Sequence, residues 1–397
     1  MSYDVGIIGG GVIGLSCAWR LAQAGARVAV FERGQVGREA SWAAAGMLAA
    51  QCEAAHHAPA IEGSIEYSKQ RAMFDLCLES RAMYGGFGYE LFEKTGEEIE
   101  VDSPTGRRGT HFHGIHYLAT HADDIAIAAF ESQKKAGHRV AFVDESITQS
   151  IPGIANVYRA FYLPDEGVVN NRKLVHILSR ALKFAEVPVY ENVEVRNVQT
   201  DNFGARVHTS KGSFLCEKVL MCAGSWSGYI PNPVAQVLQH VLPIGGQIIA
   251  LKNIIGSTII YSSNVYLVPR RDGALLVGAT VEPPGFRHAD RQNATVAGTL
   301  QLLNAACHLL PDLKNAPILD QWAGLRPGTP DGLPILGSTS VKNFYVATGH
   351  YRNGILLAPV TAKLMTDCIL NNIEPPRAFS IERFENVEKE HERIVAN

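Results

Sequence analysis

Two loops in the carboxyl-terminal part of the chain carry arginines bounded by glycines. Residues 322–332 contain Arg326, and residues 350–354 contain Arg352. A guanidinium group matches a carboxylate with two parallel hydrogen bonds, so this pair predicts a site for a small carboxylate. Tyr266, at the end of an apolar run, could add a third hydrogen bond. Either arginine alone could form a surface salt bridge, but two in glycine-bounded loops favour a binding site.

A second chemical motif opens the chain. Residues 3–8 form a short apolar run, typical of a buried parallel strand, and glycines follow with the spacing G-x-G-x-x-G. Gly9 allows a tight turn, Gly11 lets backbone approach a pyrophosphate, and Gly14 lets a helix pack on a strand. Glu32 ends the next apolar run and could accept hydrogen bonds from ribose hydroxyls. These features predict a dinucleotide site.

Length and composition limit the alternatives. The chain has 397 residues, 46% of them hydrophobic and 19% charged, so we expect two globular domains. The net charge is −3 and no basic stripe appears, which argues against a nucleic-acid partner. No run of about 18 apolar residues exists, so we expect no membrane span.

Cysteine and histidine usage gives no sign of a metal site. The seven cysteines are odd in number and form no C-x-x-C motif, which favours reduced, structural thiols in a cytoplasmic protein. His111, His113 and His116 alternate as on a strand. No cysteine or carboxylate joins them at ligand spacing, so we expect a strand over 111–116 rather than a metal site.

The segments after Glu32 are mostly helical by pattern. Residues 40–48 have small side chains, and they could begin a helix or lay backbone against a flat cofactor, which we favour. Residues 64–84 predict a long helix. The glycines of 85–88 predict a break, and 89–98 a resumed helix.

Strand, helix and strand return over residues 173–224, which indicates that the nucleotide domain resumes after an insertion. The β runs of 248–280, with a hairpin turn at 271–273, predict an antiparallel second sheet. A helix over 293–310 closes this sheet.

The predicted fold is therefore α/β with two domains. The last buried strand, 344–349, precedes the second arginine loop and a helix over 354–370. We expect a discontinuous nucleotide-binding domain of residues 1–85, 145–225 and 316–375, a substrate-binding domain of residues 86–144 and 226–315, and a tail of residues 376–397.

Taken together, the sequence resembles the flavin-dependent glycine oxidases, within the D-amino acid oxidase group, over nearly its whole length. The resemblance implies non-covalent FAD in a Rossmann-type domain, an antiparallel substrate domain and a homotetramer. One departure is the segment 242–247, where relatives tend to carry a charged residue at Ile244 or Gly245. The motifs that carry the resemblance are the glycine loop with Glu32, residues 41–48, 222–227 and 266–270, and, most specifically, 322–332 and 349–359.

The resemblance assigns the site residues. Arg326 would hold the substrate carboxylate, and Arg352 and Tyr266 would line the same pocket. The expected FAD contacts, including the glycine loop, are Gly9, Gly11, Val12, Ile13, Gly14, Glu32, Arg33, Ala40, Ser41, Ala45, Gly46, Met47, Val193, His350, Tyr351, Arg352, Asn353, Gly354, Ile355 and Leu356.

The implied reaction is oxidation of glycine, sarcosine or small D-amino acids by dioxygen to an oxoacid, ammonia and hydrogen peroxide. Hydride would pass from the substrate Cα to flavin N5 with no obligatory side-chain base. A helix beginning near Gly354 would direct its N-terminus toward the negative charge that develops on the flavin. The resemblance also implies a role in forming the thiazole of thiamine.

Three other functions stay open at this point. A D-amino acid or sarcosine dehydrogenase on the same fold would pass electrons to a quinone and would need an added acceptor. An NAD-dependent dehydrogenase could use the glycine loop but not the arginine loops. A flavoprotein that only binds or senses would carry FAD that no small amine reduces.

Overall fold

The apolar run at the start of the chain forms β1 (Ser2–Ile8), which pairs in parallel with β2 (Val28–Phe31) and β12 (Gly212–Met221) in a computed structural model of the chain. The predicted parallel strand is thus confirmed. The structure describes residues 2–58, 60–102, 114–144, 146–285 and 293–384, within which two eight-stranded sheets and one three-stranded sheet form. The other strands of the first sheet are β9 (Val189–Tyr190), β10 (Val195–Thr200), β11 (Ala205–Thr209), β18 (Ile335–Ser338) and β19 (Phe344–Thr348).

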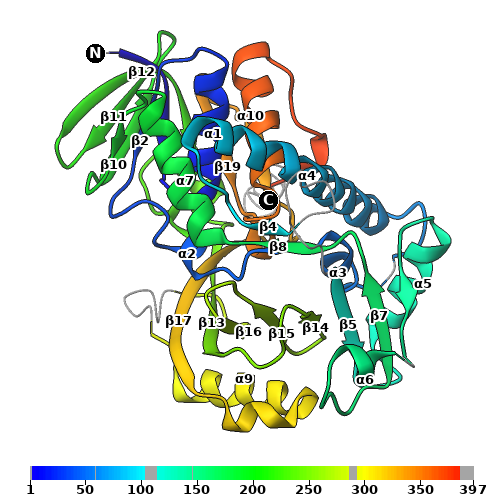
Figure 1. Cartoon of the computed structure of the whole chain (residues 1–397). Helices are drawn as coiled ribbons and strands as arrows, with labels where there is room; N and C mark the ends of the chain where they lie inside the picture. The colour runs from blue at the N-terminus through cyan, green and yellow to red at the C-terminus, as the bar shows by residue number, and fades with distance from the viewer. Residues whose placement is uncertain (1, 59, 103–113, 145, 286–292, 385–397) are drawn as a thin grey trace.

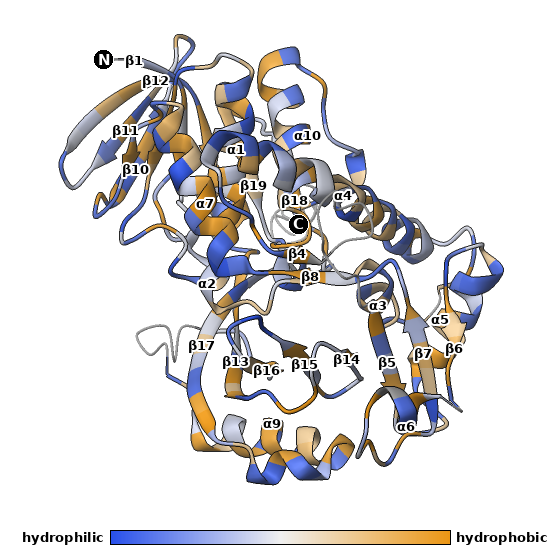
Figure 2. Ribbon diagram, in the orientation of Figure 1, coloured by the Kyte–Doolittle hydropathy of each residue, from blue (hydrophilic) through white to orange (hydrophobic). Residues whose placement is uncertain are grey.

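Four helices pack together beside this sheet, as Figure 1 shows. Their apolar faces are buried in one continuous core, and α7 illustrates why. Its Leu174, Leu178 and Leu182 recur every fourth residue and are fully buried, so they lie on one side of the helix. Figure 2 shows the resulting apolar side of α7. The four helices are α1 (Val12–Gln23), α4 (Ile65–Thr95), α7 (Asn171–Phe184) and α10 (Ala358–Asn371).

The break predicted at residues 85–88 is wrong, because α4 continues through these glycines. Tyr84, Phe87 and Leu91 are all buried on the same side of the helix. Burying one such side chain stabilises the fold by about 1.5–3 kcal/mol, which exceeds the roughly 1 kcal/mol that a glycine costs inside a helix. Tertiary packing therefore overrides local propensity.

The second sheet runs in the order β17-β13-β16-β15-β14-β5-β7-β6. The prediction of a wholly antiparallel sheet is wrong, because β5 pairs in parallel with β14. This contact joins segments far apart in the chain. Both β7 and β17 belong to this sheet, although they fall in segments expected for the nucleotide domain. The division into domains itself stays a prediction. The strands are β5 (Ile115–Ala119), β6 (Ala141–Phe142), β7 (Arg159–Leu163), β13 (Leu242–Lys252), β14 (Ile259–Tyr261), β15 (Tyr266–Pro269), β16 (Ala274–Gly278) and β17 (Ile318–Gly328).

Short elements connect the two sheets. The three-stranded sheet consists of β3 (Met47–Leu48), β8 (Gly167–Val169) and β4 (Val101–Asp102), and it lies between the larger sheets in Figure 1. The remaining helices are α2 (Ala40–Ala43), α3 (Ala50–Ala54), α5 (Ile125–Lys135), α6 (Ile147–Ser150), α8 (Ala235–Leu238) and α9 (Val296–Leu309).

Two predicted boundaries shift. The strand expected over 111–116 is β5, which begins at Ile115; His111 and His113 lie outside the described residues. The helix expected from Gly354 begins only at Ala358, after a 3-10 turn at Tyr351–Asn353. Within the described ranges, no helix is long and apolar enough to cross a lipid bilayer.

The continuity of α4 can be tested at Gly86. This residue is exposed, and a Cβ added there would meet no atom within 4 Å. We expect Gly86→Ala to raise the free energy of unfolding by about 0.5–1 kcal/mol, since alanine favours the helix, and the melting temperature should rise.

The matched control is Gly88→Ala, whose Cβ would lie 3.1 Å from Ile99 Cδ1, so it should gain less. A Gly86→Ala protein that melts earlier than the wild type would contradict the continuous helix.

Candidate functional site

The glycine loop packs at van der Waals limits. A Cβ on Gly14 would lie 2.0 Å from the carbonyl oxygen of Gly9, and a Cβ on Gly9 would lie 2.4 Å from that of Cys222. Gly9 also has φ +107, in the left-handed region. Only glycines therefore allow β1, α1 and the end of β12 to meet here. Ser41 Oγ accepts a hydrogen bond from Val12 N at 3.0 Å and binds one free N–H at the start of α1.

Glu32 is held beside this loop by the backbone. Its Oε2 accepts from Gly10 N at 2.8 Å, and its Oε1 accepts from Gly34 N at 2.9 Å. Both oxygens keep lone pairs for a further donor, because a carboxylate accepts about four hydrogen bonds. The carboxylate lines a cavity of about 730 Å³.

This cavity brings the two predicted motifs together. Its wall includes the glycine loop and Glu32 at one side and Tyr266, Arg326 and Arg352 at another. Four predicted cofactor contacts, Gly14, Val193, Asn353 and Leu356, are not on the wall. Those that do line it are Gly9, Gly11, Val12, Ile13, Glu32, Arg33, Ala40, Ser41, Ala45, Gly46, Met47, His350, Tyr351, Arg352, Gly354 and Ile355.

Arg326, on β17, is half-buried and faces the cavity. Its Nη1 donates to the carbonyl oxygens of Gly245 at 3.1 Å and Thr280 at 3.0 Å. Among the described residues, no carboxylate lies within ion-pair distance of its guanidinium group. Burial removes the charge of Arg326 from water and so lowers its pKa. No carboxylate among the described residues balances this charge.

Two glycines make room for the functional side chains. A Cβ on Gly246 would lie 2.1 Å from Arg326 Nη1, and a Cβ on Gly278 would lie 2.5 Å from the ring of Tyr266. Burial raises the pKa of Tyr266, which keeps its hydroxyl protonated and able to donate. Sequence reasoning found Arg326 and Tyr266 but not the glycines that admit them.

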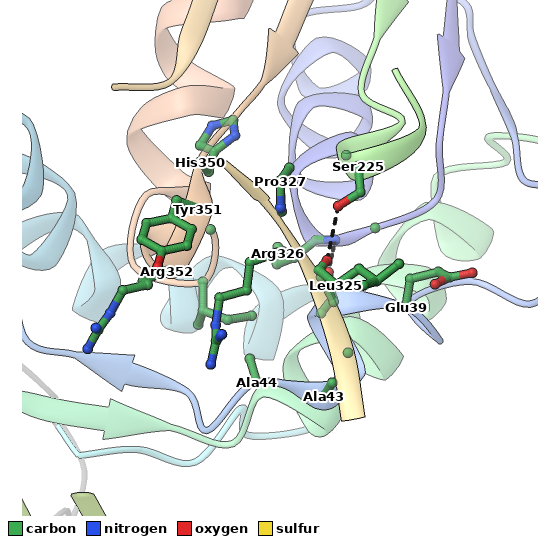
Figure 3. A pocket seen from close by; sticks show the side chains of 18 of the residues that line it. Glu39, Ala43, Ala44, Ser225, Leu325, Arg326, Pro327, His350, Tyr351 and Arg352 are labelled. Atoms are coloured by element: carbon green, nitrogen blue, oxygen red, sulfur yellow. Dashed lines mark hydrogen bonds between the residues drawn. The ribbon is translucent and has the colours of Figure 1, made fainter. Parts of the chain in front are cut away.

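Arg352 is bound differently. Its Nε lies 3.2 Å from Glu53 Oε2, and its Nη2 lies 3.3 Å from Glu53 Oε1. Burial opposes ionisation of Glu53, but the charge of Arg352 and the hydrogen bond from Tyr261, with smaller contributions from other neighbours, together lower the pKa of the carboxyl group. Figure 3 shows Arg326 and Arg352 extending toward the same side, Arg352 from the turn that also carries Tyr351.

Tyr261 and His56 complete the surroundings of Arg352. Arg352 Nη2 donates to Tyr261 Oη at 2.6 Å, and Tyr261 Oη donates to Glu53 Oε1 at 2.8 Å. His56 Nε2 lies 2.7 Å from Tyr261 Oη and 3.1 Å from Arg352 Nη2. Burial lowers the pKa of His56 to about 4. Sequence reasoning missed Glu53, His56 and Tyr261, because no local pattern marks them.

A third buried guanidinium group ties the two sheets together. Arg270 Nη1 donates to Val169 O at 3.0 Å, and Nη2 donates to Ala45 O at 2.9 Å and Asn171 Oδ1 at 2.6 Å. Ser225 Oγ adds a second link by donating to Leu325 O at 3.1 Å (Figure 3). These bonds hold β15 and β17 of the second sheet against the glycine-loop side of the cavity.

The described cysteines are all free thiols, and one lines the cavity. Cys222 is buried just after β12, and burial together with the hydrogen bond that its thiol donates to Cys17 raises its pKa well above the ordinary value. Its thiol is therefore protonated. Within the described residues, no cluster of histidine, cysteine and carboxylate side chains could hold a metal ion.

Comparison with known proteins identifies relatives that match nearly the whole of this chain. The chain is 34% identical over 377 residues to a glycine oxidase of Geobacillus kaustophilus (strain HTA426), covering 92% of this chain and 93% of that protein. It is 37% identical over 395 residues to the bifunctional protein ThiO/ThiG of Synechocystis sp. (strain ATCC 27184 / PCC 6803 / Kazusa), covering 96% of this chain and 54% of that protein.

Fold comparison agrees. The crystal structure of glycine oxidase from Geobacillus kaustophilus superposes with a TM-score of 0.82 at 32% identity, over 96% of this chain and 98% of that one. The family described as DAO, FAD dependent oxidoreductase, matches residues 4–368. This chain therefore belongs to the DAO family of FAD dependent oxidoreductases.

Proposed function

We propose that this protein is an FAD-dependent oxidase of glycine and similarly small amino acids, sarcosine and small D-amino acids included. The products would be the oxoacid, ammonia and hydrogen peroxide. The observation that carries this proposal is Arg326, a half-buried guanidinium group with no carboxylate partner among the described residues, in the same cavity as the dinucleotide loop. The relatives named glycine oxidase support it.

The cavity fits the family's cofactor, FAD. Glu32 offers a fixed carboxylate for ribose hydroxyls, and the N-terminus of α1 offers N–H groups and partial positive charge for phosphates. Gly224 lines the wall with φ +52, and a Cβ there would meet no protein atom within 4 Å, so this wall has room for a cofactor. When bound, FAD supplies the acceptor for the two electrons of amine oxidation.

The chain's own residues would bind and orient the substrate. Arg326 would donate two hydrogen bonds to the substrate carboxylate, and the neutral hydroxyl of Tyr266 would donate a third. Holding one reactant in a fixed orientation can lower a barrier by about 7 kcal/mol or more. No described side chain needs to act as a base if the amine binds neutral.

Four further features belong to this proposal, the first inferred from cysteine usage and the other three from the resemblance. We infer a location in the cytoplasm, consistent with free thiols in all seven cysteines. A homotetramer, dioxygen as the electron acceptor and a role in thiamine thiazole formation complete the proposal. The relative named ThiO/ThiG is a larger, bifunctional protein, of which this chain spans about half.

The direct test uses the purified flavoprotein under anaerobic conditions. Glycine should bleach the flavin absorbance, and air should then restore it with one hydrogen peroxide per turnover. A dehydrogenase would bleach but would need an added dye to turn over. FAD that no small amine reduces would contradict the proposal.

Substituting the carboxylate anchor should abolish most activity. We expect Arg326→Ala to lower kcat/KM for glycine by an amount equivalent to about 2–5 kcal/mol, typical of removing one partner from a buried charge pair. The control is Arg206→Ala, an exposed arginine on β11. Wild-type kinetics in Arg326→Ala would remove this residue from the site.

The role of Glu32 can be tested by cofactor affinity. Glu32→Gln turns an amide N–H₂ toward Gly10 N or Gly34 N, which are donors, and weakens the remaining acceptor. Hydrogen bonds to charged groups contribute about 1.5–3 kcal/mol, so we expect FAD to dissociate at least tenfold more readily. The measurement is titration of the apoprotein with FAD, and Glu217→Gln on the exposed side of β12 is the control.

A further inference from the structure

The charges around the amino-acid end of the cavity are unequal. Among the described residues, two guanidinium groups, Arg326 and Arg352, face it, but only one carboxylate, Glu53, lies beside them. Glu53 is only 14% exposed and contacts Arg352 through both oxygens. One cation is thus already neutralised, and the other is left for a ligand.

No other group in the described part of the chain changes this balance. Burial lowers the pKa of His56 to about 4, so its imidazole is neutral, and the buried Tyr261 and the half-buried Tyr266 stay protonated. Asp124 accepts hydrogen bonds from Tyr117 and Ser263. Glu282 is bound by Gln247 Nε2 and does not line the cavity.

Resting on the proposed function, we propose that Glu53 sets the specificity of this site, restricting it to amino acids with a single carboxylate. Arg326 would bind that carboxylate. A second carboxylate, on the amine nitrogen or the side chain, would find Arg352 already paired and Glu53 beside it with like charge. Glu53 thus excludes dicarboxylates both by occupying Arg352 and by repulsion.

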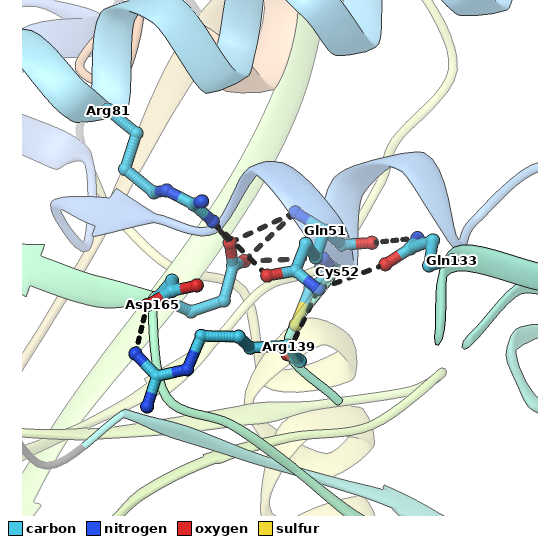
Figure 4. A network of polar contacts seen from close by, with 7 residues as sticks. Gln51, Cys52, Arg81, Gln133, Arg139 and Asp165 are labelled. Atoms are coloured by element: carbon cyan, nitrogen blue, oxygen red, sulfur yellow. Dashed lines mark hydrogen bonds and ion pairs between the residues drawn. The ribbon is translucent and has the colours of Figure 1, made fainter. Parts of the chain in front are cut away.

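The position of Glu53 is fixed from outside the cavity. Glu166 is fully buried, and its carboxylate accepts from Gln51 N at 3.1 Å and Cys52 N at 3.3 Å and pairs with Arg81. These bonds hold α3, which carries Glu53. Figure 4 shows Arg81, Gln51, Cys52 and Gln133 converging on this network. The carboxylate therefore stays beside Arg352 rather than turning away.

Once Glu53 loses its charge, polar side chains of the cavity wall could bind a second carboxylate. Ser263 and Asn264 line the wall next to Tyr261. In Glu53→Gln the amide oxygen can still accept from Arg352 and Tyr261, but Arg352 keeps its full charge. A buried cation without a counter-ion favours an anionic ligand.

The test compares one-carboxylate with two-carboxylate ligands on the FAD-loaded protein. Binding is followed by the change in flavin absorbance with acetate and malonate, and turnover is followed with sarcosine and iminodiacetate. We expect Glu53→Gln to shift the affinity ratio and the kcat/KM ratio toward the dicarboxylate by about tenfold or more. Glu53→Asp, which keeps the charge, should shift neither ratio as far.

Two further variants make the outcome decisive. Glu53→Gln combined with Arg352→Met should lose the gain, since the freed cation is removed. Glu282→Gln, a nearby carboxylate that does not contact Arg352, should bind both ligands in the wild-type ratio. If Glu53→Gln is unstable, Arg352→Met alone provides the test. It should weaken malonate binding relative to acetate binding beyond the wild-type ratio, because the negative charge of Glu53 is then no longer balanced by Arg352.

The proposal is overturned if the acetate-to-malonate ratio is unchanged in a folded, FAD-loaded Glu53→Gln protein. The binding arm needs no turnover, so failure of the proposed function is seen separately, as a wild-type protein that binds acetate but oxidises neither glycine nor sarcosine.

Discussion

The hydrogen bonds of the Arg270 guanidinium group hold the cavity together. This side chain leaves the second sheet after β15 and donates to Ala45, Val169 and Asn171, all on the glycine-loop side. Burial lowers the pKa of Arg270 to about 10, and neutral acceptors alone offset the loss of water around its charge. Because these acceptors lie on separate segments, the two halves of the site are held in one geometry.

Three half-buried arginines thus have their positive charges stabilised by different partners. Arg270 is surrounded by fixed acceptors and serves structure. Arg352 has a carboxylate, Glu53, and its charge is balanced. Arg326 has two carbonyl oxygens and no carboxylate among the described residues, which leaves part of its hydrogen-bonding capacity for a ligand. The difference between the three lies in their neighbours, not in the residue type.

How far sequence predicts this site depends on how local each feature is. The glycine loop and Glu32 lie within one continuous strand-loop-helix-strand unit, so spacing alone predicted their meeting. Arg326 and Tyr266 were found by residue type and by resemblance. Glu53 lies in α3, His56 follows that helix and Tyr261 ends β14, so only tertiary structure brings them to Arg352.

The fold shows the same limit. The parallel strands and the amphipathic α7 followed from periodicity. The uninterrupted α4 did not, because the burial of Tyr84 and Phe87 outweighs the helix-breaking tendency of neighbouring glycines. The parallel pairing of β5 with β14 joins segments more than a hundred residues apart, which no local pattern records. The start of α10 at Ala358 was not predicted either, because the sequence around Gly354 does not distinguish a helix from the 3-10 turn that precedes α10.

The protonated state of Cys222 has a consequence for durability. Peroxide attacks thiolates far faster than thiols, and sulfinic or sulfonic products would introduce charge into the wall beside the dinucleotide loop. Because burial keeps the proton on this sulfur, this part of the wall resists oxidation by peroxide. The apolar surroundings of this thiol therefore protect the cavity wall from acquiring a charge by oxidation.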